Sequence, residues 1–364
     1  MVYLRNTDLT SGMCLARDIT FFDSSAGSVV TLKTGTKLTD MNITQMNRSG
    51  AVEGAYISAE NSEVRVISSI NSEIKQNAIS NIHSLADNFM DSGKGVTQSD
   101  IDKIGDTTEQ LIDELADKKD ILINIADIKM YDDYTFHHSL SVAIMAIAIG
   151  LEMGLDRSML EELGTAGLLH DIGKTSVPID IINKKGRLTD EEYNIIRMHP
   201  IYAANHLKER HLVSEACFCG IIEHHERWDG SGYPFKLKEG QIHPYARILA
   251  VADVYDALTS NRPYRIPAPP SEAIEFIMGG SGSHFDDEIV RAFLRKVAPY
   301  PTGSKVTLST GEVGTVIKNN NEHPLRPLVS LEDGRLYDLG RTDANMNIVI
   351  TGLYEPDSAR LIHG

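Results

Sequence analysis

The sequence predicts a mainly α-helical protein with a small α+β unit at its N-terminus and a short β extension at its C-terminus. Two observations support this fold class: apolar residues at helical spacing dominate the middle of the chain, and short alternating segments with glycine turns occupy both ends. The chain has 364 residues, 41% of them hydrophobic, which is enough to bury more than one core. We therefore expect two or three folded units.

The first unit covers residues 1–64. Its alternating segments, such as VVTL and AYI, predict strands, and TDMNITQMN predicts one short helix, so we expect a small regulatory or dimerisation domain. Residues 65–124 carry apolar residues at helical spacing, for example Ile67, Ile70 and Ile74. We interpret them as a helical linker whose amphipathic helices offer a seam for a homodimer.

Residues 125–302 are predicted to form a helical domain, broken by Gly and Pro. Thr189 and Glu192 have the spacing of a capping box, which predicts a helix start at TDEEYNII. Pro200 follows His199 and indicates that this histidine lies near a helix end.

Residues 303–364 have a different texture, with segments such as KVTLSTGEVGTVIK and LVSLEDGRLYDLG. Turn signals at Thr310-Gly311 and Asp333-Gly334 separate apolar runs that alternate with polar residues. The pattern predicts β-hairpins that form a short C-terminal extension.

Charge and cysteine content limit the class of partner and the compartment. The formal net charge of −16 argues against a broad basic surface for polymeric nucleic acid or anionic lipid, so any phosphate must meet a local positive site. The most apolar run, 142–151, is shorter than the roughly 20 residues of a membrane-spanning helix, and the first residues lack a signal-peptide pattern. Cys14, Cys217 and Cys219 fit no disulfide framework. We expect a cytoplasmic protein without a membrane segment.

Two acidic residues stand in apolar helical stretches. In LLHDIGK, His170 and Asp171 end an apolar helix, and Gly173 suggests where that helix stops; a capping aspartate beside a half-buried histidine is the simpler interpretation of this motif alone. In RILAVADVYDAL, Asp253 interrupts an apolar helix, which costs several kcal/mol unless a cation compensates. A metal ion or an arginine, such as Arg262, would be sufficient.

The segment HHERWDGSGYP places His224 and His225 at the end of the apolar helix CFCGIIEHH. Neighbouring residues on a helix project about 100° apart, so we expect the two imidazoles to face two ions rather than share one. In binuclear sites the ions lie roughly 3.5 to 4 Å apart, and a carboxylate such as Asp171 is a natural bridge between them.

Two further histidines, His138 and His199, complete a set of five histidines and two aspartates near helix ends or in apolar stretches. Nitrogen and oxygen ligands without thiolate suit iron, manganese, zinc, cobalt or nickel. His137 points elsewhere on its helix, and we expect it to be exposed to solvent. The seven candidate ligands are His138, His170, Asp171, His199, His224, His225 and Asp253.

These residues, together with Gly232-Tyr233-Pro234, resemble the HD-GYP family, the subgroup of HD-domain phosphohydrolases that cleaves cyclic dinucleotides. The resemblance covers roughly residues 125–300 and rests on HDIGK, HHERWDGSGYP and DVYDALTSNRPY. It implies that residues 125–302 form an HD-type helical bundle with catalytic activity. The fragment LTSGMCLARDI is similar to a small N-terminal domain often fused to such modules.

The resemblance also assigns roles to individual residues. It makes the seven residues ligands of two divalent ions, iron ahead of manganese, nickel, cobalt or zinc, with Asp171 as the bridge. Members with a third metal have a glutamate one helical turn before the first histidine, where this chain has Tyr134, so we expect two ions. Lys174 would be catalytic and bind a substrate phosphate, Arg262 and Arg265 would also bind phosphate, and Tyr233 would lie near the substrate.

The implied function is a metal-dependent phosphodiesterase that hydrolyses cyclic di-GMP to linear pGpG and, with a second cleavage, to GMP. Two metals lower the pKa of a bridging water, the resulting hydroxide attacks phosphorus in line, and Lys174 and Arg262 offset the charge on the phosphate oxygens.

Other functions stay open at this point. A preference for 3'3'-cyclic GMP-AMP is one alternative, because nothing in the sequence fixes the base. The second histidine pair and the GYP turn argue against a simpler HD phosphohydrolase acting on nucleotides. A non-catalytic cyclic-dinucleotide receptor is a further alternative; such a protein would lack ligands, whereas all seven are present here.

Overall fold

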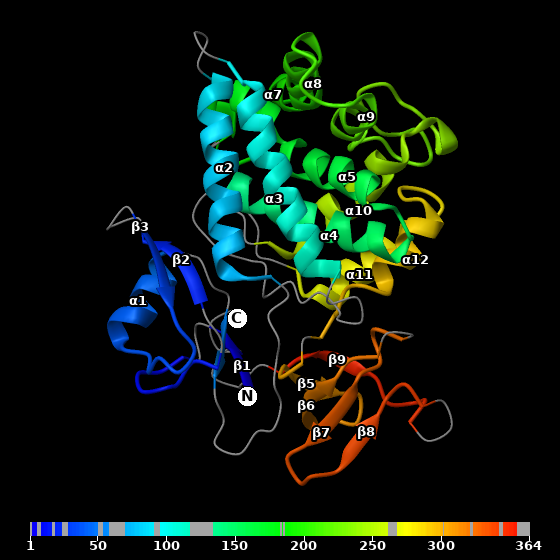
Figure 1. Cartoon of the computed structure of the whole chain (residues 1–364). Helices are drawn as coiled ribbons and strands as arrows, with labels where there is room; N and C mark the ends of the chain where they lie inside the picture. The colour runs from blue at the N-terminus through cyan, green and yellow to red at the C-terminus, as the bar shows by residue number, and fades with distance from the viewer. Residues whose placement is uncertain are drawn as a thin grey trace.

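The computed structural model has three units, each built around an apolar core of its own (Figure 1). The largest unit is helical, which confirms the predicted mainly α fold class. The structure describes residues 2–5, 9–16, 19–23, 28–49, 54–57, 70–90, 95–116, 134–182, 184, 186–260, 268–300, 302–320, 323–341 and 345–354.

The N-terminal unit combines two antiparallel strand pairs with one helix. Strand β1 (Val2–Arg5) pairs with β4 (Gly54–Ile57), and β2 (Ile19–Asp23) pairs with β3 (Ser28–Leu32). Helix α1 (Asp40–Ser49) begins after Thr39, whose hydroxyl accepts a hydrogen bond from the backbone N–H of Asn42 at 3.1 Å. The predicted strands and the short helix are therefore present.

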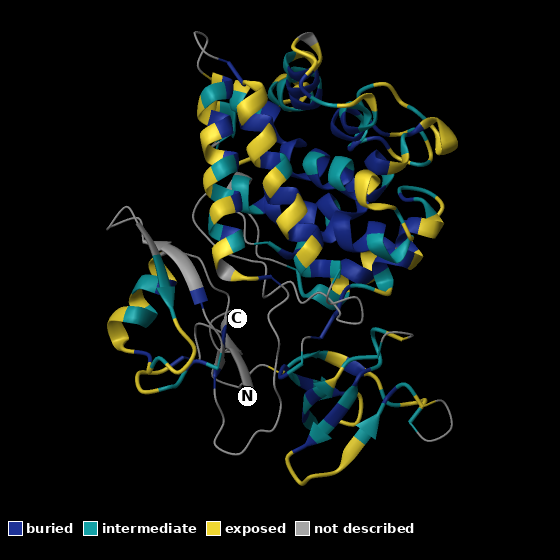
Figure 2. Ribbon diagram, viewed as in Figure 1, coloured by how far each residue is buried: buried dark blue, intermediate teal, exposed yellow. Residues whose placement is uncertain are grey.

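Helices α2 (Ser72–Met90) and α3 (Gln98–Ala116) follow the first unit and share a core with the large helical unit. Thr97 and Asp100 cap the start of α3 reciprocally, and the buried residues of α3 repeat at helical spacing on one side. Figure 2 shows exposed residues on the outward side of both helices. The two helices thus form one wall of the large unit, so the predicted linker is packed rather than extended.

The large unit is a bundle in which α4 packs against α5 and α10, and α9 packs against α5, α8 and α10. The predicted capping box of Thr189 and Glu192 is present at the start of α7, and Asp156 and Ser214 cap α5 and α9. Its helices are α4 (Tyr134–Glu152), α5 (Arg157–Leu169), η3 (Ile172–Ser176), α6 (Ile179–Ile182), α7 (Asp190–Ile196), α8 (His199–Glu209), α9 (Glu215–Glu223), η4 (Glu239–Gln241), α10 (Pro244–Thr259), α11 (Pro270–Gly279) and α12 (Asp287–Leu294).

The C-terminal unit is an antiparallel five-stranded sheet with the order β8-β7-β6-β5-β9. Both predicted turns are confirmed: Gly311 and Gly334 adopt φ values of +83° and +85°, a region that favours glycine. Its strands are β5 (Lys305–Leu308), β6 (Val313–Lys318), β7 (Leu328–Leu331), β8 (Leu336–Asp338) and β9 (Ile350–Leu353).

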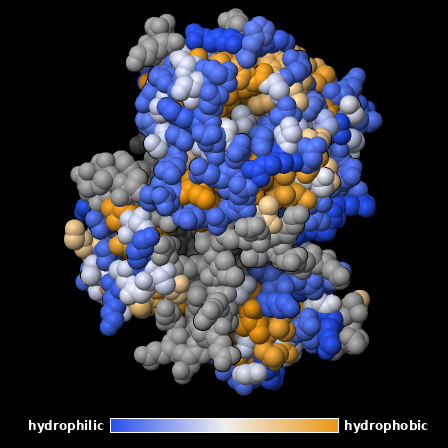
Figure 3. All heavy atoms as spheres, viewed as in Figure 1, coloured by the Kyte–Doolittle hydropathy of each residue, from blue (hydrophilic) through white to orange (hydrophobic). Residues whose placement is uncertain are grey.

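The surface carries hydrophobic side chains in separate patches among hydrophilic ones on the face drawn in Figure 3.

Helix α4 is the most apolar long helix, and residues 138–150 along it are buried in the bundle core. Among the described residues, no helix combines the length and the apolar character that crossing a membrane requires.

Candidate metal centre

The seven predicted ligands converge in the helical unit because most of them lie at helix ends that meet. His138 lies in the second turn of α4, His170 directly follows α5, and His199 opens α8. His224 and His225 directly follow α9, and Asp253 lies within α10. All are buried except His225, which is partly exposed.

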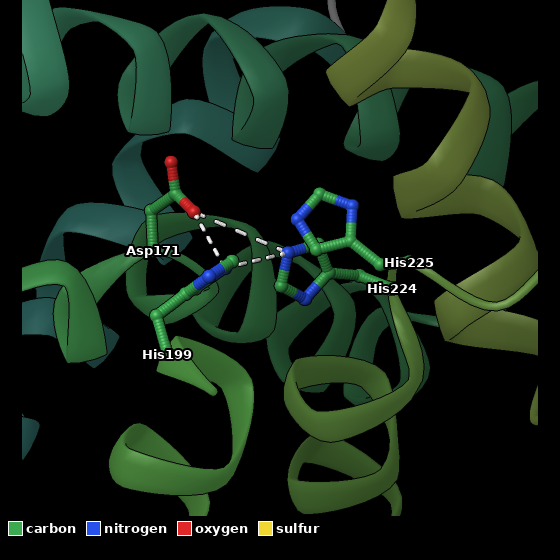
Figure 4. Close-up of side chains that lie close together, drawn as sticks. All are labelled: Asp171, His199, His224 and His225. Carbon is green, nitrogen blue, oxygen red and sulfur yellow. Dashed lines mark hydrogen bonds and ion pairs between the residues drawn. The ribbon is translucent and has the colours of Figure 1, made fainter. Parts of the chain in front are cut away.

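Asp171 lies at the centre of the cluster, and its two carboxylate oxygens face different histidines. Oδ1 is 3.2 Å from His199 Nε2 and 4.0 Å from His224 Nε2. Oδ2 is 3.5 Å from His138 Nε2 and 3.6 Å from His170 Nε2. Figure 4 shows the Asp171 carboxylate directed toward His199 and His224. This is the arrangement that a carboxylate needs if it is to bridge two cations.

The donor atoms form two overlapping groups, each with its atoms within 4.8 Å of one another. Asp253 closes the cluster on another side, because its oxygens lie 3.0 Å from His138 Nε2 and 3.7 Å from His225 Nδ1. The first group is His138, His170 and Asp171, and the second is Asp171, His199, His224 and His225.

Three of the imidazole rings are anchored in the same way. The Nδ1 atoms of His170, His199 and His224 lie 2.7, 2.7 and 2.6 Å from the carbonyl oxygen three residues earlier. A carbonyl oxygen only accepts hydrogen bonds, so each Nδ1 must carry the proton and each Nε2 presents a lone pair. Metal-binding histidines are oriented by such contacts.

The lone pairs point at a carboxylate, which repels them unless a cation lies between. His170 Nε2 is buried and has no hydrogen-bond partner among the described residues, although it lies 3.6 Å from Asp171 Oδ2. A buried nitrogen lone pair beside a carboxylate oxygen suits a cation that contacts both atoms. The buried His/Asp cluster therefore fits a divalent metal site.

Asp256 is a residue of the centre that the sequence interpretation missed. Its Oδ2 lies 2.7 Å from His138 Nδ1, and it also accepts a hydrogen bond from Ser260 Oγ at 3.1 Å. A carboxylate on the far nitrogen fixes the ring and raises its basicity as a ligand. The available signal was a second acidic residue three positions after Asp253, on the same side of an apolar helix.

Burial keeps most of the histidines neutral and therefore able to bind metal. It lowers the pKa of His170, lowers that of His224 well below its usual value, and lowers the pKa of His225 to about 3. Burial also opposes charge on His138, but hydrogen bonds to Asp253 and Asp256 outweigh it and raise the pKa of His138 to about 9. The raised pKa of His138 thus reflects its place between two carboxylates.

The two aspartates are ionised. Burial raises the pKa of Asp171, but the Lys174 ammonium and the neighbouring imidazoles overcome this and hold it well below its usual value. Burial likewise opposes ionisation of Asp253, and the hydrogen bond to His138 outweighs it and holds the pKa low. Buried carboxylates beside neutral imidazoles form a pocket that attracts cations.

Gly173 has a different role from the predicted helix stop. Helix α5 ends at Leu169, with His170 in the helical region as its cap, and Gly173 lies inside η3. A Cβ atom at Gly173 would lie 2.0 Å from the carbonyl oxygen of His199. The glycine therefore allows η3 and α8 to approach closely, which brings His199 to Asp171.

The expectation that His224 and His225 face separate ions is not supported. Helix α9 ends at Glu223, and His224 keeps helical φ and ψ angles of −62° and −14° as its C-cap. Their ring centroids are 4.0 Å apart, and both residues belong to the same group of donor atoms. One cation could therefore contact both rings.

The loop after these histidines brings Tyr233 to the centre, as expected. A Cβ atom at Gly232 would lie 2.5 Å from Glu226 Cα, so the turn requires glycine. The Tyr233 ring centroid is 4.7 Å from that of His225.

Glu226, which the sequence interpretation also missed, is buried and accepts hydrogen bonds from the backbone N–H groups of Phe235 at 2.6 Å and Leu237 at 3.1 Å.

The remaining predicted residues differ in how far the structure describes them. Lys174 pairs with Asp171 Oδ2, so its ammonium lies at the centre. Arg262 and Arg265 lie outside the described residues, and so does the side chain of Tyr134, the first residue of α4.

The expectation of a solvent-exposed His137 is wrong. This residue is half-buried, and burial lowers its pKa to about 4. This side of α4 is covered instead of open to solvent, because α2 packs against α4.

Two family profiles match the chain. The profile of the HD domain matches residues 109–289, and that of the KOW domain associated with the HD domain matches residues 305–338. The cyclic di-GMP phosphodiesterase PA4108 of Pseudomonas aeruginosa is 42% identical over 210 residues, which is 58% of this chain and 50% of that protein. This chain belongs to the HD-GYP family.

Other relatives of this HD-GYP chain are named for two different substrates. A cyclic di-GMP phosphodiesterase of Thermotoga maritima is 38% identical over 49% of this chain and 50% of that protein. The 3'3'-cGAMP-specific phosphodiesterase 1 of Vibrio cholerae is 39% identical over 42% of this chain and 35% of that protein. The chain thus spans half or less of the length of these three relatives.

One solved structure supports the fold. Bd1817, described as a HDG"Y"P protein from Bdellovibrio bacteriovorus, matches with a TM-score of 0.50 and 15% identity over 80% of this chain and 97% of that protein. At this identity the likeness concerns the fold alone.

Proposed function

We propose that this HD-GYP chain is a metal-dependent phosphodiesterase that hydrolyses cyclic di-GMP to linear pGpG and, in a second cleavage, to GMP. One observation carries the proposal: a single buried carboxylate, Asp171, directs its two oxygens at different sets of histidine nitrogens. Relatives that are 42% and 38% identical and are named cyclic di-GMP phosphodiesterases support the choice of substrate.

The seven ligands would hold two divalent ions, for which iron is the first candidate, and Asp171 would bind both ions. Such ions, when bound, lower the pKa of water and offset charge on a phosphodiester. His170, His199 and His224 would supply Nε2 atoms from rings fixed by backbone carbonyls, and the carboxylates of Asp171 and Asp253 would balance the charge of the ions.

The protein's own part in the reaction is to position the phosphate and to balance its charge. Lys174 pairs with Asp171, so its ammonium lies at the centre, where it would offset negative charge on a non-bridging phosphate oxygen as the water oxygen bonds to phosphorus. Tyr233 packs against His225 and forms the wall on which the nucleotide would rest. Arg262 and Arg265 would add positive charge for the phosphate groups.

A specific observation favours 3'3'-cyclic GMP-AMP as a second candidate substrate, because a relative with that specificity in its name is 39% identical over 155 residues. A receptor without turnover is the third candidate, and the complete ligand set argues against it.

The test combines metal analysis with chromatography of products. The purified protein, supplied with ferrous iron or manganese without oxygen, is incubated with cyclic di-GMP or cyclic GMP-AMP. We expect pGpG from the first substrate and slower conversion of the second. A protein that holds two metals per chain and leaves both substrates intact would be a receptor instead.

We also propose a cytoplasmic location for the reaction and a role for each of the other parts of the chain. Cys14, Cys217 and Cys219 are free thiols, which supports a reducing cytoplasm. Residues 1–64 would act as the regulatory or dimerisation domain and residues 125–302 as the catalytic domain. Homodimer formation through the amphipathic helices of 65–124 stays a prediction, and so do the bounds 125–302 and 303–364 of the last two units.

A further inference from the structure

Arg197 lies near the metal centre and has no carboxylate partner among the described residues. It follows α7 directly, two residues before the ligand His199, and is half-buried. Its guanidinium carbon lies 4.5 Å from the ring centroid of Tyr233 and 5.8 Å from that of Tyr193. Within the part of the chain that the structure describes, Arg197 forms no ion pair.

The aromatic contacts hold the guanidinium close to the centre. The Tyr233 ring contacts the Arg197 guanidinium and also lies 4.7 Å from the His225 ring, so the same aromatic ring contacts this cation and a predicted ligand. A guanidinium that rests against aromatic faces keeps its N–H groups available at its edge for an acceptor. Tyr193 is 50% exposed, so a ligand can reach this position from solvent.

Charge balance makes this arginine distinctive. The chain carries a net charge of −16, and the nearby Lys174 is already paired with Asp171. A cyclic dinucleotide has two phosphodiesters, and the metal centre can act on only one of them at a time. The second phosphate therefore needs its own cation, beyond the metal centre and within reach of it.

We propose that Arg197, held between Tyr193 and Tyr233, binds the phosphate of the cyclic dinucleotide that is not being cleaved. This assignment rests on the proposed function. It makes Arg197 a specificity residue that favours substrates with two phosphates over substrates with a single phosphodiester. The scissile phosphate would stay with the metal centre.

The test compares two substrates in matched variants. Arg197→Met keeps the length of the side chain and removes its charge, and Arg197→Lys keeps the charge. Arg291→Met is the control, because Arg291 is exposed on α12 and pairs with Asp287. Steady-state kinetics are measured with cyclic di-GMP and with bis(p-nitrophenyl) phosphate, a diester with one phosphate, and the dissociation constant for cyclic di-GMP is measured by calorimetry.

We expect Arg197→Met to lower kcat/KM for cyclic di-GMP by about 10- to 100-fold, mainly through KM, as for loss of a hydrogen bond to a charged group. Its kcat/KM for bis(p-nitrophenyl) phosphate should stay within about twofold of wild type, Arg197→Lys should recover part of the loss, and Arg291→Met should behave as wild type. Equal losses on both substrates would overturn the proposal, and so would no loss on either.

Failure of the proposed function has a different signature. If the wild-type protein binds cyclic di-GMP without cleaving it, the proposed function fails, and weaker binding by Arg197→Met still supports the role of Arg197. If the wild-type protein binds neither cyclic di-GMP nor cyclic GMP-AMP, the assignment of Arg197 is wrong together with the proposed function.

Discussion

Replacing Asp256 tests whether the carboxylate behind His138 sets the affinity of the metal centre. Asp256 Oδ2 lies 2.7 Å from His138 Nδ1, and both side chains are almost fully buried. Asp256→Asn keeps the size and one acceptor oxygen but removes the charge. Asp256→Ala removes the acceptor as well and leaves a buried imidazole N–H without a partner.

The magnitude follows from the contact that is lost. Removing the partner of a metal-bound histidine typically lowers metal affinity or activity 10- to 100-fold. We expect Asp256→Asn at the lower end and Asp256→Ala at the upper end, which corresponds to about 1.4 and about 2.8 kcal/mol of binding free energy. The Ala variant should be weaker because an unsatisfied buried N–H adds its desolvation cost.

The assay is competition for metal with a chromophoric chelator, which gives the dissociation constant of each ion. Ser260→Ala is the matched control, since it removes the other hydrogen bond to Asp256 Oδ2, of 3.1 Å, without touching His138. We expect it to change metal affinity less than about threefold, because this part-buried hydrogen bond does not involve the histidine. Wild-type affinity in both Asp256 variants would refute the reasoning, and so would an Asn variant weaker than the Ala variant.

Three further predictions concern stability and the substrate wall. Gly173→Ala should lower the free energy of unfolding by about 3 kcal/mol or more, because the new Cβ would clash with backbone atoms. Gly105→Ala in α3, where a Cβ meets nothing within 4 Å, should raise the free energy of unfolding by about 0.5 to 1 kcal/mol. Urea unfolding measures both changes. In the chelator-treated protein, the raised pKa of His138 stabilises the fold below pH 6.5, and this stabilisation should be lost as the pH rises toward about 9, by about 3 kcal/mol. The lowered pKa of His225 acts in the opposite sense, so stability should also fall as the pH falls from 6.5 toward about 3, and urea unfolding that shows no loss between pH 6.5 and 9 would contradict the account. Glu226 accepts hydrogen bonds from two backbone N–H groups, and Glu226→Gln would place the amide NH2 group against one of them. We therefore expect kcat/KM for cyclic di-GMP to fall about tenfold, while the metal content per chain stays unchanged.

The sequence predicted many of the elements and the seven residues that the structure brings together, although not Asp256, because the signals for them are local. Capping at Thr189 and turns at Gly311 and Gly334 depend on a few neighbouring residues, and the structure has them where the pattern predicts. A buried aspartate such as Asp253 stands out in a sequence because its cost in an apolar helix requires a partner.

The parts that could not be predicted depend on how helices meet. The role of Gly173 is to allow a close approach of η3 to α8, and one group of donor atoms includes both His224 and His225. The contact between Asp256 and His138 joins residues 118 positions apart in the chain. Local spacing contains no information about any of these distances.

The most direct test of the account is a joint measurement of metal content and turnover in Asp171→Asn. This variant keeps the volume of the side chain and removes the charge that the two groups of histidines share. The account predicts that the variant binds fewer than one metal per chain and has no measurable turnover of cyclic di-GMP, while its circular dichroism stays that of wild type. A variant that holds two metals per chain and cleaves cyclic di-GMP at the wild-type rate would contradict it.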